Sequence, residues 1–138
     1  MAVEIEAPVR RLLDEPNMAH VATLERSGGP RVQPTWIGTD GTSLFINTQE
    51  GRIWPLRVRR DPRIALTVPN REQPAEYVEI VGRVVEETTE GAKDHVDELS
   101  RTYLGIDYPR HFEGEVRLVL RIEPERINYV NLVGDDIT

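Results

Sequence analysis

The side chains of this sequence that are best suited to bind an anion are five arginines within twelve residues: Arg52, Arg57, Arg59, Arg60 and Arg63. Asp61 is the only acidic residue between the first and the last of them, although the whole chain has a net charge of −7. A guanidinium group forms paired hydrogen bonds with phosphate or carboxylate oxygens. This local positive charge therefore predicts an anion site, and the alternative is that the arginines only solvate a short helix.

Two neighbouring segments could complete a site for an anionic, planar ligand. A predicted strand ends just before the arginines, and a phosphate clamp could form there from Asn47, Thr48 and Arg52. An earlier strand could form a flat slot for a ring system from Gln33, Pro34, Thr35 and Trp36. Pro34 has no backbone N–H to donate, which suggests a sheet edge, a bulge or a place where a ligand replaces a neighbouring strand.

The residue types assign no catalytic side chain and no metal site. The chain contains no cysteine, and its three histidines, His20, His95 and His111, do not have the spacing of metal ligands. The acidic pairs fall at predicted helix ends, on a polar helix face and in the C-terminal tail, and neither a GxGxxG nor a P-loop sequence occurs. An anion site without acid–base machinery is expected where a bound cofactor supplies the reactivity.

Length and composition predict a single domain spanning residues 1–138. The chain is 38% hydrophobic and only 6% aromatic, so the predicted core is aliphatic. No apolar run approaches the roughly 20 residues of a membrane span, and the acidic N-terminus lacks a signal-peptide core. A cytoplasmic protein that has no contact with membranes is therefore expected. The acidic balance argues against nucleic acid as a partner.

Alternating apolar residues and turn signals predict a mainly β fold, an antiparallel β-barrel with two or three short helices at its margin. The predicted strands are residues 19–24, 31–37, 43–48, 63–68, 76–84, 116–122 and 127–133. The predicted helices begin near Pro8, Ile53 and Thr89. Thr88 or Thr89 is expected to cap the last helix, and Gly105 is expected to end it.

Several residues within these elements carry more specific expectations. Gly82 indicates a bulge or a close backbone approach, and Pro124 is expected to break the strand that precedes it. The helix at residues 53–60 has one face that carries Ile53, Leu56 and Arg60. In the strand 116–122, alternation places Val116, Leu118, Leu120 and Ile122 inward and Arg117, Arg121 and Glu123 outward.

The order and spacing of these segments resembles the flavin-binding split-barrel family related to pyridoxamine 5′-phosphate oxidase, and in particular its actinobacterial branch that uses the deazaflavin coenzyme F420. The segments that carry the resemblance are residues 20–24, 29–36, 44–48, 51–52, 59–63 and 77–84. The resemblance implies a six- to seven-stranded split β-barrel. It also implies a homodimer in which two cofactors bind in clefts shared between the subunits.

The resemblance also assigns roles to individual residues. The cofactor ring would lie against the segment from Gln33 to Trp36. Its phosphate would be held near Asn47, Thr48 and Arg52, with help from Arg57 and Arg60. Tyr77 of a second copy of the chain would close the site.

One position departs from the family pattern. Members often have a lysine two residues after the position of Arg52, where this chain has Trp54. The loss of a charge-assisted hydrogen bond would weaken phosphate binding by roughly 1.5–3 kcal/mol. Trp54 would instead stack on the cofactor ring or cap the slot, or it would be a packing residue at a dimer interface. These alternatives leave the identity of the cofactor open.

The function that follows from the resemblance is an oxidoreductase that transfers hydride from reduced F420 to a small organic acceptor. One alternative is an FMN-dependent oxidoreductase of the same fold. Another is a non-catalytic carrier of a flavin or deazaflavin, which the residue Trp54 favours. A haem-degrading split barrel is disfavoured because no histidine has the setting of a haem ligand.

Overall fold

The computed structural model describes residues 3–134, which form seven strands and three helices. The strands are β1 (Ala19–Leu24), β2 (Pro30–Thr35), β3 (Gly38–Thr39), β4 (Leu44–Gln49), β5 (Arg63–Pro69), β6 (Glu76–Thr88) and β7 (Arg117–Asn131). The helices are α1 (Ala7–Asp14), α2 (Ile53–Arg60) and α3 (Ala92–Tyr103). This composition confirms the predicted mainly β fold with short flanking helices.

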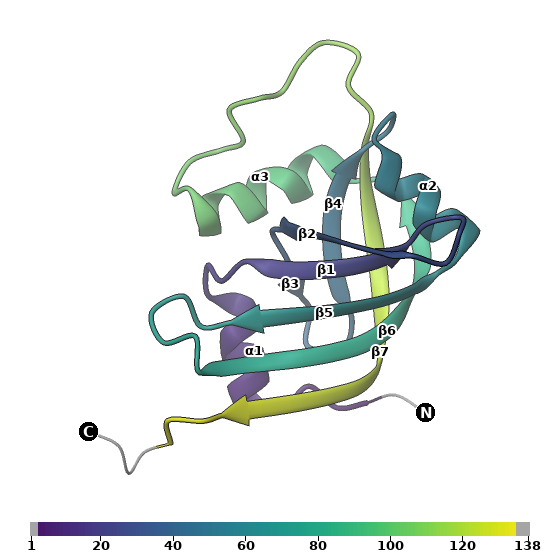
Figure 1. Cartoon of the computed structure of the whole chain (residues 1–138). Coiled ribbons are helices and arrows are strands. Elements are labelled where there is room, and N and C mark those ends of the chain that lie inside the picture. Colours follow the sequence, from purple (N-terminus) through teal and green to yellow (C-terminus); the bar gives the residue numbers. More distant parts are fainter. Residues whose placement is uncertain (1–2, 135–138) are drawn as a thin grey trace.

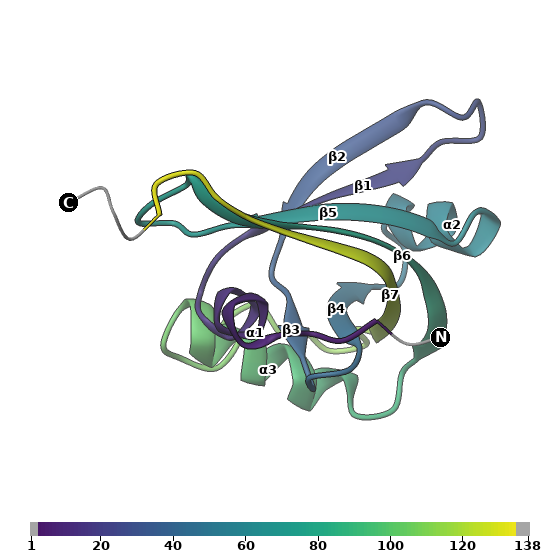
Figure 2. The same cartoon turned by 90° about the horizontal axis from the view of Figure 1, so that it is seen from below.

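The seven strands form one antiparallel sheet in the order β2-β1-β5-β6-β7-β4-β3. The long strands β6 and β7 bend, so that the sheet curls into a half-barrel (Figure 1). The edge strands β2 and β3 do not pair with each other, and the hairpin of β1 and β2 extends away from the curl (Figure 2). The barrel is therefore split, and Pro34 lies on an edge strand as expected.

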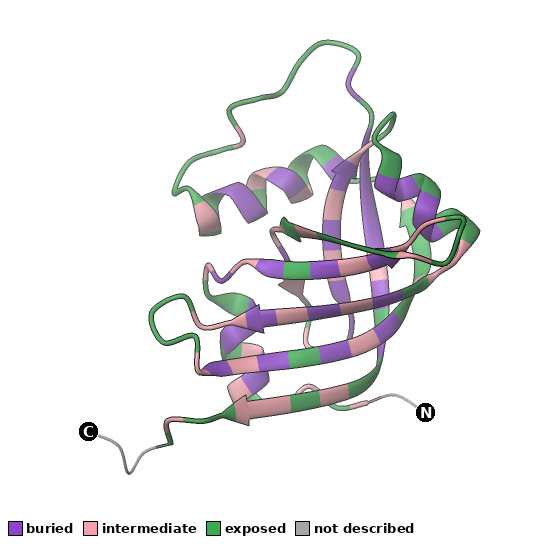
Figure 3. Cartoon of the chain, viewed as in Figure 1, coloured by how far each residue is buried: buried purple, intermediate pink, exposed green. Residues whose placement is uncertain are grey.

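The core fills the concave side of the sheet. Burial alternates along β4 and β5, where every second residue is buried, because successive side chains point to opposite faces (Figure 3). Helix α1 packs against this side with its buried side chains Val9, Leu12 and Leu13. Full burial of such a side chain contributes about 1.5–3 kcal/mol. No helix within residues 3–134 is long and apolar enough to cross a lipid bilayer.

The prediction for Gly82 is confirmed, but the prediction for Pro124 is wrong. The register between β6 and β7 shifts between Val81 and Gly82, where Gly82 pairs with Pro124. A Cβ atom on Gly82 would lie 2.3 Å from the carbonyl oxygen of Glu123. This bulge accommodates the proline, so β7 continues through it to Asn131 instead of breaking into two strands.

Helix α2 forms where it is predicted, but the face with Ile53 and Leu56 is turned to solvent. These side chains are 64% and 54% exposed, whereas Trp54 and Val58 belong to the core. Helix α3 also differs at its start, because Gly91 is its N-cap and no threonine side chain caps it.

Candidate functional site

A cavity of about 210 Å³ brings together five of the residues that the sequence assigns to cofactor binding. It lies where the β2–β3 connection meets α3 and the connection 104–116. Its predicted members are Pro34, Thr35, Trp36, Asn47 and Arg52, and its other lining residues are Met18, Val96, Leu99, Tyr108 and Arg117. Three residues of the predicted slot and two of the predicted clamp therefore line the same cavity, although the two groups are separated in sequence.

Asn47 occupies the centre of the hydrogen-bond network at this cavity. Its Nδ2 donates to the carbonyl oxygen of Ala92 at 2.8 Å and lies 3.0 Å from Nδ1 of His95. Its Oδ1 accepts a hydrogen bond from Nε of Arg117 at 2.9 Å. A carbonyl oxygen can only accept and a guanidinium can only donate, so these two partners fix the orientation of the amide.

Thr48 does not join Asn47 in a clamp, because neighbouring strand residues point to opposite faces. Asn47 faces α3, whereas Thr48 points into the core and is fully buried. Its Oγ1 has no hydrogen-bond partner within the described part of the chain. Gln33 on β2 is half-buried and does not line the cavity.

Arg117 is the site residue that the sequence reasoning missed. It is only 5% exposed, and its Nη1 lies 3.4 Å from Oε1 of Gln49. Its guanidinium carbon lies 5.0 Å from the centre of the Tyr108 ring. No carboxylate of residues 3–134 lies within 4.0 Å of it. A buried cation without an anionic partner is costly, so Arg117 fits an anionic ligand at this cavity.

Arg117 points away from the interior of the barrel, as the alternation predicted. It is nevertheless buried and not exposed to solvent. Leu118, Leu120 and Ile122 are buried in the barrel, as expected. On the opposite face of β7, α3 contacts the strand and Tyr108 of the connection 104–116 lies against Arg117, which explains the burial of Arg117. The prediction that Val116 points inward is wrong, since it is 45% exposed.

Ion pairs neutralise two members of the arginine cluster. Arg59 donates to Glu50 at 2.8 Å and to Glu87 at 2.9 Å, and these hydrogen bonds raise its pKa. Arg63 donates to Asp61 at 2.7 Å and thereby lowers the pKa of that carboxyl to about 2. The cluster is therefore partly a set of surface ion pairs, as the solvation alternative expects.

The remaining members of the cluster occupy three different surroundings. Arg52 lines the cavity. Arg57 is buried on the inner face of α2, and Arg60 donates to the carbonyl oxygen of Leu24 at 3.1 Å, but neither lines the cavity. Trp54 is 4% exposed within the core, so it does not line the cavity either.

Aromatic rings form one wall of the site. Trp36 stacks on Tyr103 with ring centres 5.4 Å apart, and it meets Tyr108 edge-on at 6.1 Å. The Tyr103 hydroxyl donates to the carbonyl oxygen of Asn17 at 2.7 Å and accepts from the backbone N–H of Ile37 at 3.2 Å. Burial raises the pKa of Tyr103. The hydrogen bonds hold Tyr103 in place, and the stacking on Tyr103 in turn orients the Trp36 ring.

Trp36 also borders a second, more apolar cavity of about 460 Å³. The two cavities share Trp36 and Met18. The other lining residues of the second cavity are Pro16, His20, Pro69, Asn70, Arg71, Pro74, Tyr103 and Leu104. An elongated ligand could therefore place an anionic group beside Arg52 and Arg117 and an apolar group beyond Trp36.

The connection 104–116 places Tyr108 at the site, and His111 attaches this connection to α3. His111 Nε2 lies 2.8 Å from Oδ1 of Asp97, and its Nδ1 contacts Oε1 of Glu115. The same Asp97 oxygen accepts from the backbone N–H of Tyr108 at 2.9 Å. The carboxylates of Asp97 and Glu115 raise the pKa of His111. Positive charge on this ring therefore strengthens the attachment of the connection to α3.

Tyr77 lies on β6, paired with Pro69 on β5 and Val130 on β7, and it does not line the cavity of its own chain. No group of three or more histidine, cysteine or acidic side chains within residues 3–134 could hold a metal ion.

The family model of pyridoxamine 5′-phosphate oxidase matches residues 5–131, so the chain belongs to that family. A solved structure named F420 reductase is similar with 23% identity and a TM-score of 0.79, over 86% of this chain and 94% of that one. A conserved hypothetical protein from Mycobacterium tuberculosis is similar with 19% identity and a TM-score of 0.75, over 94% and 86%. General stress protein 26 from Bacillus anthracis is similar with 15% identity and a TM-score of 0.66, over 87% and 88%.

At these identities, the likenesses to solved structures show that the split-barrel fold is shared. A search among curated proteins found no match. The family assignment therefore rests on the family model, and the choice of a cofactor has to be argued from the site itself.

Proposed function

We propose that this protein is a reductase that binds F420 and transfers hydride from the reduced cofactor to a small organic acceptor. FMN is the alternative cofactor for the same site. The observation that carries the proposal is the pairing of Arg117, a buried cation without a carboxylate partner, with the fixed ring of Trp36 in one cavity. The family and the fold of an F420 reductase support it.

The residues at the cavity fit an anionic, planar cofactor. Arg52 and Arg117 would hold its phosphate or carboxylate groups, because guanidinium hydrogen bonds to anions are stronger than neutral ones. Asn47 keeps the Arg117 side chain in place through its Oδ1. Trp36 would lie against the ring system, held in its plane by Tyr103.

The bound cofactor would supply the hydride chemistry, and the protein would position it. Arg52 and Arg117 would hold the anionic end, which fixes how far the ring extends beyond Trp36. Tyr108 would cover the site from the connection 104–116 and exclude water. The apolar cavity on the far side of Trp36 would take the acceptor.

We further propose that the working unit is a homodimer. The 210 Å³ cavity of one chain is smaller than the roughly 300–1,000 Å³ of a typical ligand pocket, so a second copy would complete it. Three exposed apolar side chains on β2 and α2 would be covered by such a copy: Val32 at 67%, Ile53 at 64% and Leu56 at 54%. Tyr77 of the partner subunit would then close the site, and light scattering should find dimers.

Titration of the purified protein with F420 and with FMN tests the cofactor assignment. Arg52→Ala should weaken binding of the cofactor about tenfold or more, since it removes a charge-assisted contact of about 1.5–3 kcal/mol. Arg63→Ala is the matched control, because Arg63 is in the same cluster but pairs with Asp61. Unchanged affinity in Arg52→Ala, or equal losses in both variants, would show that the clamp is wrongly assigned.

Turnover assays then separate an enzyme from a carrier. The protein with bound cofactor is assayed against a panel of enones and quinones. Reduction of an acceptor with reduced F420 supports the proposal, and reduction with FMN alone supports the alternative cofactor. Binding of either cofactor without turnover of any acceptor would assign a carrier role.

A further inference from the structure

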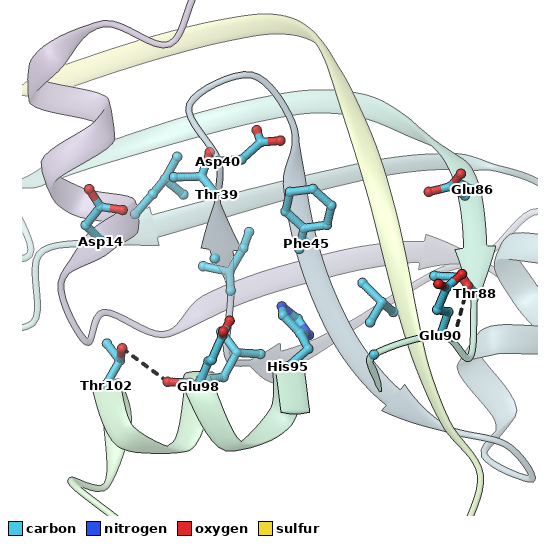
Figure 4. Close-up of a pocket in the computed structure, with 16 residues that line it drawn as sticks. Asp14, Thr39, Asp40, Phe45, Glu86, Thr88, Glu90, His95, Glu98 and Thr102 are labelled. Atoms are coloured by element: carbon cyan, nitrogen blue, oxygen red, sulfur yellow. Dashed lines mark hydrogen bonds between the residues drawn. The ribbon is translucent and has the colours of Figure 1, made fainter. Parts of the chain in front are cut away.

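A third cavity, of about 510 Å³, is lined by Phe45 and by His95, the residue that contacts Asn47 (Figure 4). Its volume lies within the range of small-molecule sites. Helices α1 and α3 and strands β3, β4, β6 and β7 contribute to its walls. Apolar side chains form much of its surface: Leu13, Ile37, Phe45, Leu99 and Val119.

The charged side chains that line this cavity are all acidic: Asp14, Asp40, Glu86, Glu90 and Glu98. No lysine or arginine lines it. Two of the carboxylates have a cation of their own, since Asp14 pairs with Arg10 at 2.9 Å and Glu86 with Arg121 at 3.4 Å.

The other three carboxylates form no ion pair within residues 3–134, but the pKa of Asp40 is lowered by its hydrogen bond from Ser43 and also by the nearby charge of Arg10. Asp40 accepts hydrogen bonds from the backbone N–H groups of Thr42 and Ser43, each at 2.8 Å. No cation of residues 3–134 lies within ion-pair distance of Glu90 or Glu98. The rim of the cavity therefore keeps a net negative charge, although Arg101 lies near Glu98, and this charge disfavours an anionic occupant.

An aromatic side chain, Phe45, lines the same cavity as these carboxylates. Phe45 projects from β4 towards His95 on α3, with the two ring centres 6.3 Å apart at an angle of 66° (Figure 4). In that view, Glu98 and Glu90 lie on either side of His95. An ammonium group is attracted both to an aromatic face and to nearby carboxylates. A cavity with both features suits a cation that carries an apolar body.

The hydrogen bonds of Asn47 define what His95 offers to such a ligand. Both hydrogens of the Asn47 amide are donated, one to the carbonyl oxygen of Ala92 and one to Nδ1 of His95. Nδ1 must therefore be the acceptor, so the neutral ring carries its proton on Nε2. Burial lowers the pKa of His95 and favours this neutral form. Nε2 has no partner among the described residues and can donate to an acceptor atom of a ligand.

We propose that this cavity is a second ligand site, selective for a small amine with an apolar or aromatic body. The ammonium group would lie beside the carboxylate of Glu98, with Glu90 adding to the negative charge of the cavity, and the body would lie on Phe45. An oxygen atom on the ligand would accept the Nε2–H of His95. This site does not depend on the cofactor assignment, because its lining residues do not include Arg52, Trp36 or Arg117.

Three ligands of the same shape and different charge test the proposal: 2-phenylethylamine, 2-phenylethanol and phenylacetate. They are titrated into the cofactor-free protein while the ring signals of the histidines are followed by ¹H–¹³C NMR. A His95→Gln variant assigns the His95 signal, and His111 is the internal control because it lies outside the cavity. The amine should shift His95 with a dissociation constant on the order of 1 mM, and phenylacetate should not shift it.

Two variants then locate the ammonium group. Glu98→Gln should weaken the amine about threefold, and Phe45→Leu should have a similar effect by removing the aromatic face. Glu113→Gln is the control for overall charge, since Glu113 is exposed on the connection 104–116 and lies outside the cavity. The proposal is overturned if the alcohol binds as tightly as the amine, if Glu113→Gln weakens binding as much as Glu98→Gln, or if about 20 mM amine leaves His95 unshifted.

Discussion

Arg117 provides a test that separates a ligand-binding residue from a structural one. The change is Arg117→Met, which keeps an apolar chain of similar length against Tyr108 and removes the charge. If the guanidinium holds the cofactor anion, its loss removes at least one charge-assisted hydrogen bond of about 1.5–3 kcal/mol. The affinity for the cofactor should then fall roughly 10- to 150-fold.

The stability of the cofactor-free protein should respond differently. The variant leaves Oδ1 of Asn47 without its donor, at a cost of about 1–3 kcal/mol. It also removes a buried charge that no described carboxylate neutralises, and that burial is unfavourable by several kcal/mol. The second contribution offsets the first, so the variant should be at least as stable as the wild type. Urea unfolding measures the stability, and titration with F420 and FMN measures the affinity.

Arg121→Met is the matched control for this experiment. Arg121 lies on the same strand and the same side of it, but it is more exposed and pairs with Glu86. Its loss should leave cofactor affinity unchanged. The reasoning is refuted if Arg117→Met destabilises the protein by more than about 2 kcal/mol and keeps full affinity, because Arg117 would then be a structural residue.

Three further predictions concern the fold, the connection 104–116 and the dimer. Gly82→Ala places a Cβ atom 2.3 Å from the Glu123 carbonyl oxygen, so it should lower the free energy of unfolding by about 1–3 kcal/mol. Urea unfolding measures this change. An unchanged urea transition would contradict the bulge geometry. The raised pKa of His111 adds stability that is complete below its unfolded pKa and is lost as pH rises through its folded pKa. Wild type and His111→Gln should therefore differ in stability at acidic pH and converge above that range, and a constant difference would contradict this. Ile53→Asp places a charge in an exposed apolar patch and should therefore convert dimers to monomers, which light scattering measures. A dimer that persists in this variant would show that the interface lies elsewhere.

The sequence predicted the elements of this fold well where one face of an element is buried. Strand β5 and helix α1 have the expected apolar periodicity, because their inner faces meet the core. The continuity of β7 through Pro124 could not be predicted, because it depends on the bulge at Gly82 of another strand. The exposed face of α2 was also not predictable, since Ile53 and Leu56 are apolar without being in the core.

The candidate site was predictable to the extent that its residues are close in sequence. Asn47 and Arg52 follow one strand, and both line the cavity. The contact of Arg117 with Asn47 joins residues 70 positions apart, and it arises only from the pairing of β4 with β7. No local pattern around Arg117 indicates that the connection 104–116 will cover it. The partial signal in the sequence was the arginine itself at the start of a strongly apolar strand.

The position of positive charge at the site depends on these long-range contacts. The sequence suggested that replacing the usual lysine by Trp54 weakens the site. In the structure, Trp54 fills the core beneath α2, where a lysine would be buried, and Arg117 brings a guanidinium to the cavity from β7. A cation next to an anion acts through its distance and its surroundings, not through its place in the chain. We therefore expect that the absence of a lysine at position 54 does not weaken the proposed anion site, because the fold brings the charge of Arg117 to the same cavity.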